Sequence, residues 1–186
     1  MAVLEFVLIP SYEEQLFRSY LESYLEEIDL LVGDPVDPDL NHRYPLYSQY
    51  FRDDPFHQPF RILASNPDLP PNIQPPEFIG FFFLTLISPQ DFPSGIKSII
   101  DSHRKVASLT DLYIFPEFRR KGLAWDFYSS IIRLATDNGW DVCWECDVRN
   151  TPALHFYERV LDKIALEYPF QCSKQQYIKK SQHNAT

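Results

Sequence analysis

Residues 112–124, LYIFPEFRRKGLA, carry the pattern that decides the fold of this 186-residue chain. The apolar run over residues 108–115 predicts a strand that Pro116 ends, and residues 122–138 have helical spacing. A strand, a turn and a long helix therefore follow one another. A helix start leaves backbone N–H groups without partners and carries partial positive charge. We expect the turn at residues 119–124 to bind a phosphate group, with Gly122 allowing a close approach.

Basic side chains surround this turn. Arg119, Arg120 and Lys121 precede Gly122, and Ala124 keeps the next position small. Each cation favours an anion within a Debye length of about 8–10 Å. The alternative is a basic turn that is simply exposed to solvent, and the turn alone does not separate the two interpretations.

The segments on either side predict alternating strands and helices. Ser11 and Glu14 have the spacing of a capping box ahead of a helix that runs to Leu31. Apolar runs predict the remaining elements. Strands are expected at residues 2–9, 60–64, 77–87, 108–115, 141–148 and 163–171, and a further helix is expected after Asn150. Residues 33–59 are expected to form an aromatic, proline-rich loop with one short helix around residues 46–51, and residues 88–107 form a long connection.

Composition limits the class of protein. Hydrophobic residues make up 45% of the chain, which is enough for a core, and no apolar run approaches the roughly 20 residues of a membrane helix. We expect a cytoplasmic protein with one domain over residues 1–178 and a disordered tail over residues 179–186. Lysine and arginine number 17 against 26 acidic residues, a net charge of −9. That sign disfavours nucleic acid as a partner and is compatible with a cationic one.

A second motif, NTPALHFYE at residues 150–158, follows the turn after one helix and one strand. Together, residues 112–124 and the positions Asn150, Ala153, Phe156, Tyr157 and Glu158 resemble the GNAT superfamily of N-acetyltransferases. The resemblance covers residues 106–162 well. Trp144 and Glu145 look most like its diamine-acetyltransferase branch. The resemblance implies an α+β fold in a three-layer α/β arrangement, with a mixed, mostly antiparallel central sheet flanked by helices and a V-shaped split between two central strands.

The resemblance also implies the cofactor, acetyl-CoA, and the residues that hold it. Backbone groups of the strand would pair with the pantetheine arm, amides of the turn would hold the pyrophosphate, and Asn150 would bind the pantetheine. Asn150 is equally suited to cap the helix that follows it. The implied cofactor-binding positions are Leu112, Tyr113, Ile114, Arg119, Arg120, Lys121, Gly122, Leu123, Ala124, Asn150, Ala153 and Tyr157.

Direct attack of an amine on the thioester sets the chemical requirements. A lysine-like amine has a pKa near 10.4, so its neutral form costs roughly 4–5 kcal/mol at pH 7. Asp111 is the carboxylate expected nearest the attack site, and it would act as a base, orient the substrate or form a salt bridge. Glu145 is the next candidate base. Tyr157 would protonate the departing thiolate, or else only pack the last helix. An N–H of Tyr113 or Ile114 would stabilise the oxyanion.

Several alternatives stay open from the residues alone. The acceptor is expected to be a small amine or polyamine, or a basic peptide with a lysine or free N-terminus. A degenerate relative that only senses acyl-CoA is the competing function. The connection at residues 88–107 would shape the acceptor site, contact a second copy in a homodimer, or be an insertion without a functional role. Cys143 and Cys146 have the spacing of a metal motif, but strand positions three apart face opposite ways and no second pair follows, so we expect no metal.

Overall fold

The computed structural model describes residues 3–52, 55–65, 75–91, 104–144 and 146–167. The chain consists of two compact units, Met1–Glu145 and Cys146–Thr186. Among the described residues, the first unit contains five strands, and the second contains the helix α4 (Thr151–Glu167). None of the described helices is both long enough and apolar enough to cross a membrane.

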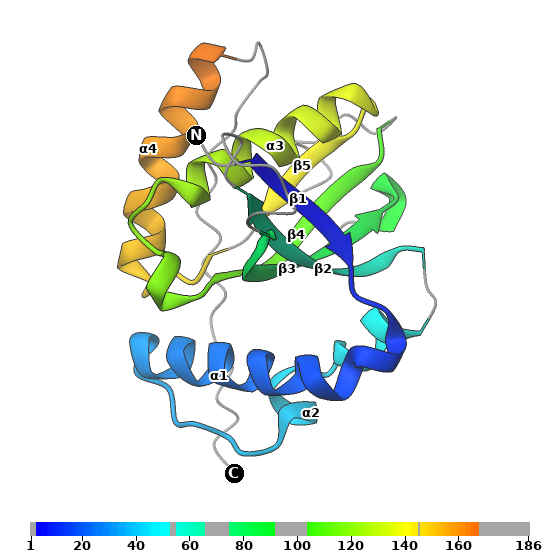
Figure 1. Cartoon of the computed structure of the whole chain (residues 1–186), viewed down its shortest axis with the longest axis vertical. Helices are drawn as coiled ribbons and strands as arrows, with labels where there is room; N and C mark the ends of the chain where they lie inside the picture. Colours follow the sequence, from blue (N-terminus) through cyan, green and yellow to red (C-terminus); the bar gives the residue numbers. More distant parts are fainter. Residues whose placement is uncertain (1–2, 53–54, 66–74, 92–103, 145, 168–186) are drawn as a thin grey trace. The chain divides into compact units, whose positions relative to one another are not determined.

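A mixed five-stranded sheet forms the centre of the first unit (Figure 1). Its strands follow chain order across the sheet: β1 (Val3–Leu8), β2 (His57–Ser65), β3 (Glu77–Ile87), β4 (Val106–Ile114) and β5 (Asp141–Trp144). The first four pair antiparallel, and only β4 and β5 are parallel. A parallel pair needs a crossover, and helix α3 (Leu123–Asp137) supplies it. This is the mostly antiparallel sheet that the sequence predicts.

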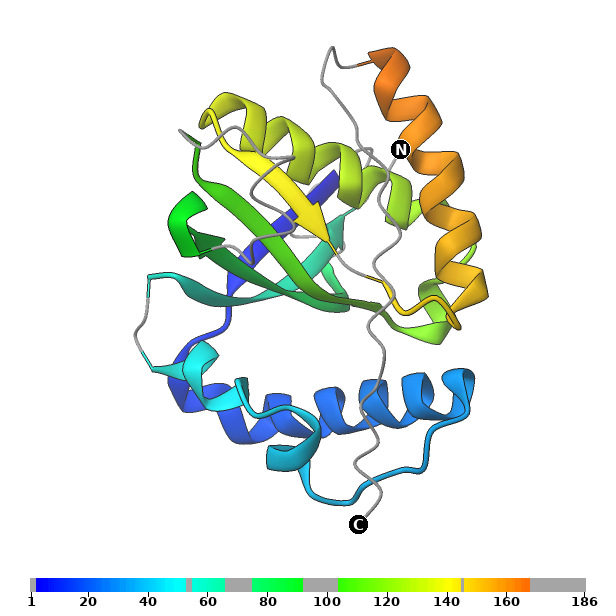
Figure 2. The ribbon, with the colours of Figure 1, turned by 180° about the vertical axis from the view of Figure 1, so that it is seen from behind.

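Helices α1 (Glu14–Val32) and α3 lie on opposite faces of the sheet, as the two views in Figures 1 and 2 show. The alternation of side chains along β3 explains this arrangement. Phe81 faces α1, where its ring centroid lies 4.7 Å from that of Phe17. Phe82 faces α3, 4.9 Å from Phe127. Because both faces of β3 are covered, it is the continuous apolar run seen in the sequence.

The α1 layer also includes the loop after that helix. Helix α2 (Leu40–Arg43) and the 3-10 turn η2 (Tyr47–Phe51) follow α1 and place Tyr47, Tyr50 and Phe51 in the core. The short helix predicted at the end of the aromatic loop is therefore present, as a 3-10 turn. Residues 92–103 of the long connection lie outside the described residues, and η3 (Pro89–Asp91) precedes them.

Strands β4 and β5 pair over a short length only. Their register runs from Val106–Asp141 to Leu109–Trp144. Strand β4 then continues for five residues to Ile114, with a bulge at Thr110 where the register to β3 shifts. Because β5 ends at Trp144, the second half of β4 has an outer edge that β5 does not pair with. The V-shaped split expected between two central strands lies here.

Three sequence-based predictions are wrong. Ser11 does not cap α1: the chain enters through a 3-10 turn, η1 (Ser11–Glu13), and neither Pro10 nor Glu13 makes a side-chain cap bond. Strand β5 ends at Trp144 rather than at residue 148. Residues 163–167 are helical rather than a strand, because α4 continues to Glu167. Within Thr151–Glu167 there is no glycine, and the proline there, Pro152, lies in the first turn. No helix-breaking residue therefore ends the helix before Glu167.

Gly80 marks the closest approach of β3 to β4. A Cβ atom there would lie 2.1 Å from the carbonyl oxygen of Tyr113 and 3.0 Å from the Cα of Ile114. Both neighbours are backbone atoms, so a side chain at this position must push the two central strands apart. Gly80 faces the second half of β4, which is the part with the open outer edge. The glycine therefore keeps this edge in its position against β3.

We expect Gly80→Ala to destabilise the protein by about 1–3 kcal/mol, the usual cost of overpacking. Urea unfolding of both proteins measures this difference. Gly33→Ala is the matched control, because Gly33 has a φ of 78° and no neighbour within 4 Å of the added Cβ. Its cost is backbone strain of about 1 kcal/mol. Equal unfolding midpoints for Gly80→Ala and the parent protein would contradict the close approach.

Candidate active site

The turn between β4 and α3 presents a row of backbone donors. Arg120 and Gly122 have left-handed φ values of 61° and 83°. Gly122 is the N-cap residue of α3 and gives the helix no side-chain cap. Among the described residues, no acceptor binds the backbone N–H groups of residues 120–124. Successive N–H groups in such a turn form a concavity that suits an anion, and the helix dipole adds to it.

The guanidinium of Arg119 is engaged by a carboxylate of the protein itself. Its guanidinium makes a bidentate pair with Glu27 of α1, at 2.6 and 2.9 Å, and its Nε donates to the carbonyl oxygen of Ile114 at 2.7 Å. The hydrogen bond from Arg119 holds the pKa of Glu27 below its usual value. Lys121 lies over the ring of Phe118, 5.2 Å from its centroid. Arg119 thus ties α1 to the end of β4, and the backbone is the main feature of the turn that suits a phosphate.

The open edge of β4 carries the backbone groups of Leu112 and Ile114. Phe115 N–H donates to the carbonyl of Ile79 on β3, 2.9 Å away. Backbone groups alternate in direction along an antiparallel strand, so Tyr113 and Phe115 face β3. Leu112 and Ile114 face the opposite side, where the pairing with β5 has already stopped. These are the two positions predicted to pair with pantetheine.

Asp111 lies just after the bulge of β4, on the face covered by α1. Tyr24 of α1 donates to its Oδ1 at 2.8 Å, and Tyr44, which follows α2, donates to its Oδ2. Burial raises the pKa of Asp111 above its ordinary value, and the hydrogen bonds from Tyr44 and Tyr24 offset part of that rise. A half-buried carboxylate with two phenol donors keeps a fixed orientation and still has lone pairs for a third donor.

The aromatic loop divides between packing and the site. Tyr47 donates to the carbonyl of Glu14 at 2.9 Å, and Tyr50 shares hydrogen bonds with Thr85 and Thr110 at 2.9 and 2.7 Å. These two phenols support the core. Tyr44 alone of the loop tyrosines reaches Asp111.

Sequence reasoning missed two residues of α1. In the sequence, Tyr24 is one of the apolar positions at helical spacing between residues 16 and 31, and Glu27 is one of ten acids within the first forty residues. In the structure Tyr24 binds Asp111, while Glu27 accepts from Arg119 and from the hydroxyl of Tyr113 at 2.8 Å. The spacing of Tyr20, Tyr24 and Glu27 places them on one helix face, which was the available signal.

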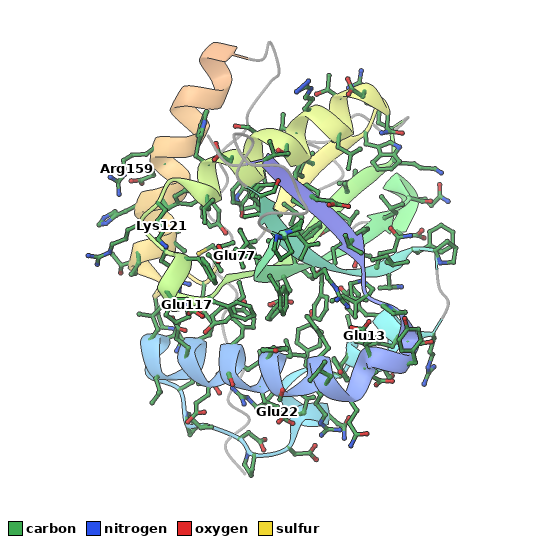
Figure 3. The ribbon with its side chains drawn as sticks, in the orientation of Figure 1. Glu13, Glu22, Glu77, Glu117, Lys121 and Arg159 are labelled. Carbon is green, nitrogen blue, oxygen red and sulfur yellow. The ribbon has the colours of Figure 1, made fainter. Side chains whose placement is uncertain are left out.

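An open depression of about 440 Å³ lies on the α1 side of the sheet, with Tyr113 of β4 and Tyr20 of α1 in its lining. Figure 3 shows Glu117 and Lys121 on the segment that connects β4 to α3, and Glu117 belongs to the lining. The other lining residues are Tyr20, Ser23, Phe78, Tyr113, Phe115 and Phe118. Its volume is in the range of small-molecule sites.

The second unit contains the other predicted site residues. The Oδ1 of Asn150 accepts from the N–H of Ala153 at 3.2 Å, so Asn150 does cap α4. Tyr157 is half-buried, with its ring centroid 5.6 Å from that of Phe156. The cofactor contacts expected of Asn150, Ala153 and Tyr157 stay predictions.

Comparison with solved structures finds the same fold. The aminoglycoside N-acetyltransferase AAC(6')-Iy in complex with CoA is 15% identical to this chain in sequence. The match covers 98% of this chain and 97% of the other, with a TM-score of 0.56. YycN from Bacillus subtilis is 16% identical over 96% and 98%, with a TM-score of 0.57. Arabidopsis thaliana NAA60, in complex with a bisubstrate analogue, is 16% identical over 84% and 83%, with a TM-score of 0.54. At sequence identities of 15–16%, this structural likeness shows only that the fold is shared.

Comparison at the level of sequence identifies the family. No curated protein matches the chain significantly. The model of the acetyltransferase (GNAT) family matches residues 29–162, which is most of the chain and includes both the turn and the segment from Asn150 to Tyr157. The expected α+β fold is confirmed, and so is the expected cofactor class. The chain belongs to the GNAT family and is an acyltransferase that uses acetyl-CoA.

Proposed function

We propose that this enzyme transfers the acetyl group of acetyl-CoA to a cationic primary amine, by direct attack of the amine on the thioester. The observation that carries the proposal is Asp111, a half-buried carboxylate at the point where β4 leaves β5 and where two phenols hold it in one orientation. An ammonium group supplies the donors that the remaining lone pairs of this carboxylate accept.

The cofactor would lie along the open edge of β4 and the turn. In this arrangement the backbone of Leu112 and Ile114 pairs with the pantetheine arm, and the N–H groups of residues 120–124 bind the pyrophosphate. Tyr113 has its N–H directed at β3, so Ile114 is the better of the two predicted donors for the oxyanion. From the family resemblance we also propose that Asn150 binds the pantetheine, that Tyr157 is the acid that protonates the thiolate, and that residues 1–178 act as one catalytic domain.

Asp111 would serve as both anchor and base. It first binds the ammonium group and then accepts a proton from it, which leaves a neutral amine beside the thioester. The pKa of Asp111, raised by burial, brings it closer to the value that suits a base near neutral pH. The amine then forms a bond to the carbonyl carbon, and the C–S bond breaks as the tetrahedral intermediate collapses. Tyr157 protonates the departing thiolate of CoA, and the second proton that the nitrogen loses as the amide forms restores the phenol of Tyr157 through solvent. Asp111 then releases its own proton to solvent.

A small amine is the acceptor class that we favour over a protein. AAC(6')-Iy, with the same fold, is named for acetylation of an aminoglycoside, a small molecule. The resemblance of Trp144 and Glu145 to the diamine branch points the same way, although Glu145 lies outside the described residues. The ten acidic side chains within residues 1–40 favour a positively charged acceptor.

Two measurements test the proposed function. The first is release of the CoA thiol in the presence of a panel of primary amines, and the second is thermal unfolding with and without acetyl-CoA. Ligand at 100 times its Kd should stabilise the protein by about 2.7 kcal/mol and raise Tm. Thiol release should depend on added amine. A raised Tm with no thiol release from any amine would identify a sensor of acyl-CoA instead. No change in Tm at millimolar acetyl-CoA would contradict the cofactor assignment.

Tyr157→Phe should lower kcat by about 10²-fold, because the thiolate then leaves without its proton donor. The Kd of acetyl-CoA, measured by calorimetry, should stay unchanged. Tyr12→Phe is the matched control, because Tyr12 is 85% exposed and its hydroxyl serves no proposed step. An unchanged kcat in Tyr157→Phe would show that Tyr157 only packs α4.

Tyr24→Phe tests the role of Asp111 through pH. The hydrogen bond from Tyr24 lowers the pKa of Asp111, so removing the hydroxyl raises that pKa further. The reaction needs ionised Asp111, and activity is lost as pH falls through its pKa. The acidic limb of kcat/KM should therefore move to higher pH, and activity should recover at alkaline pH.

Tyr47→Phe is the control for this profile, because it removes another phenol of the α1 layer whose hydroxyl binds a backbone carbonyl. Its acidic limb should match that of the parent enzyme. A uniform loss of activity at every pH in Tyr24→Phe would indicate a structural role only. The same limb in Tyr24→Phe and in the parent enzyme would remove Asp111 as the titrating group.

A further inference from the structure

Glu27 of α1 accepts hydrogen bonds from two other parts of the chain. Its Oε1 accepts from Arg119 at 2.6 Å, and its Oε2 accepts from Arg119 at 2.9 Å and from the hydroxyl of Tyr113 at 2.8 Å. Burial raises the pKa of Tyr113 to about 12, and the hydrogen bond to Glu27 adds to that rise, so the phenol keeps its proton and stays a donor. One carboxylate therefore joins α1, β4 and the start of the turn at residues 119–124.

All three guanidinium nitrogens of Arg119 are engaged. Nη1 and Nη2 bind Glu27, and Nε donates to the carbonyl oxygen of Ile114 at 2.7 Å. The guanidinium also lies over the ring of Tyr113, with its central carbon 5.0 Å from the ring centroid. Because a guanidinium is planar and its donors form a rigid fork, the bidentate contact with Glu27 fixes the direction of Nε. Glu27 thereby aims Nε at the Ile114 carbonyl.

The carbonyl that Arg119 holds belongs to the last residue of β4. Ile114 directs its backbone groups to the outer side of the strand, where β5 no longer pairs. The N–H of the same peptide unit belongs to Phe115 and donates to the Ile79 carbonyl on β3 at 2.9 Å. This peptide is therefore held from both sides, by β3 through its N–H and by Arg119 through its oxygen.

A surface salt bridge is the ordinary interpretation of the pair formed by Glu27 and Arg119. Their side chains are 41% and 37% exposed, and exposed ion pairs contribute little to the free energy of unfolding. The pair formed by Arg18 and Glu22 has similar exposure, but it lies within α1. Arg119 differs from Arg18 because its third nitrogen binds the backbone of β4. The contact that distinguishes the pair is thus directed at the strand edge rather than at the stability of the fold.

We propose that Glu27 is a positioning residue for acetyl transfer: it orients Arg119, which holds the peptide between Ile114 and Phe115 in the direction that the thioester requires. This inference rests on the proposed function, in which the N–H of Ile114 stabilises the oxyanion. That N–H lies on the same residue and the same side of the strand as the carbonyl held by Arg119. A rotation of this residue moves the donor away from the reacting carbonyl, and a misplacement of about 1 Å can lower the rate about 10²-fold.

Two conservative variants break this orientation. Glu27→Gln keeps the length of the side chain but removes the charge and one of the two carboxylate oxygens. Arg119→Lys keeps the positive charge but removes the Nε donor and the bidentate geometry. Glu22→Gln is the matched control, because it removes the acid of another exposed ion pair of α1, 2.9 Å from Arg18.

Three measurements compare these proteins: kcat for thiol release with saturating acetyl-CoA and amine, the Kd of acetyl-CoA by calorimetry, and Tm. We expect kcat to fall about tenfold in Glu27→Gln and in Arg119→Lys, with the Kd and Tm close to those of the parent enzyme. The double variant should lose no more activity than the worse single variant, because both changes break the same chain of contacts. Glu22→Gln should match the parent enzyme.

An NMR measurement follows the peptide itself, without any ligand. The amide resonance of Phe115 reports on its own peptide unit, whose oxygen accepts the hydrogen bond from Arg119. This resonance should shift in Glu27→Gln and in Arg119→Lys and keep its position in Glu22→Gln. An unchanged Phe115 resonance in Glu27→Gln would overturn the inference, whether or not amines are acetylated.

The outcomes separate this inference from the proposed function. An unchanged kcat in Glu27→Gln, losses that add in the double variant, or a loss of activity that follows a lower Tm would each overturn the positioning role. Amine-dependent thiol release would still support the proposed function in those cases. A weaker Kd with an unchanged kcat would also overturn it and assign the pair to cofactor binding. Absence of thiol release from every amine would reject the proposed function, and the Phe115 resonance alone would then decide whether Glu27 orients this peptide.

Discussion

A half-buried carboxylate must be hydrogen-bonded, and this requirement at Asp111 organises the structure around it. Tyr24 reaches it from α1 and Tyr44 from the loop after α2, so both segments are drawn to the same point on β4. The pair formed by Arg119 and Glu27 ties α1 to the end of the same strand. The orientation of the helical layer is thereby coupled to the strand that carries the chemistry.

Strand β4 supplies three different surfaces to one reaction. Its backbone edge beyond Leu109 is not paired with β5, its α1 face presents Asp111 and Tyr113, and its end leads into the turn for which we propose phosphate binding. The bulge at Thr110 sits where these surfaces meet. Bulges re-aim a strand and increase its local twist, which suits the divergence of β4 from β5.

Strong local patterns predicted most of the fold. The apolar run of Glu77–Ile87 predicted β3 to the residue, because both faces of that strand are buried. Helix spacing and a terminal glycine likewise identified α3. Predictions that relied on one or two polar residues did worse, since the capping box at Ser11 is not formed. The strand expected at residues 163–171 failed because its apolar pattern over residues 163–167 fits a continued helix equally well.

By itself the sequence determined the family and the cofactor class, and it predicted a phosphate-binding role for the turn at residues 119–124, because these depend on local backbone geometry and on the spacing of a few residues. The sequence also identified Asp111 as the carboxylate expected nearest the attack site. Only the tertiary structure decided what surrounds that carboxylate. Tyr24 and Tyr44 are 87 and 67 residues away from Asp111 in the chain, and Glu27 is 92 residues from Arg119. Such contacts arise when a helix face packs against a strand, so no local pattern of residues encodes them.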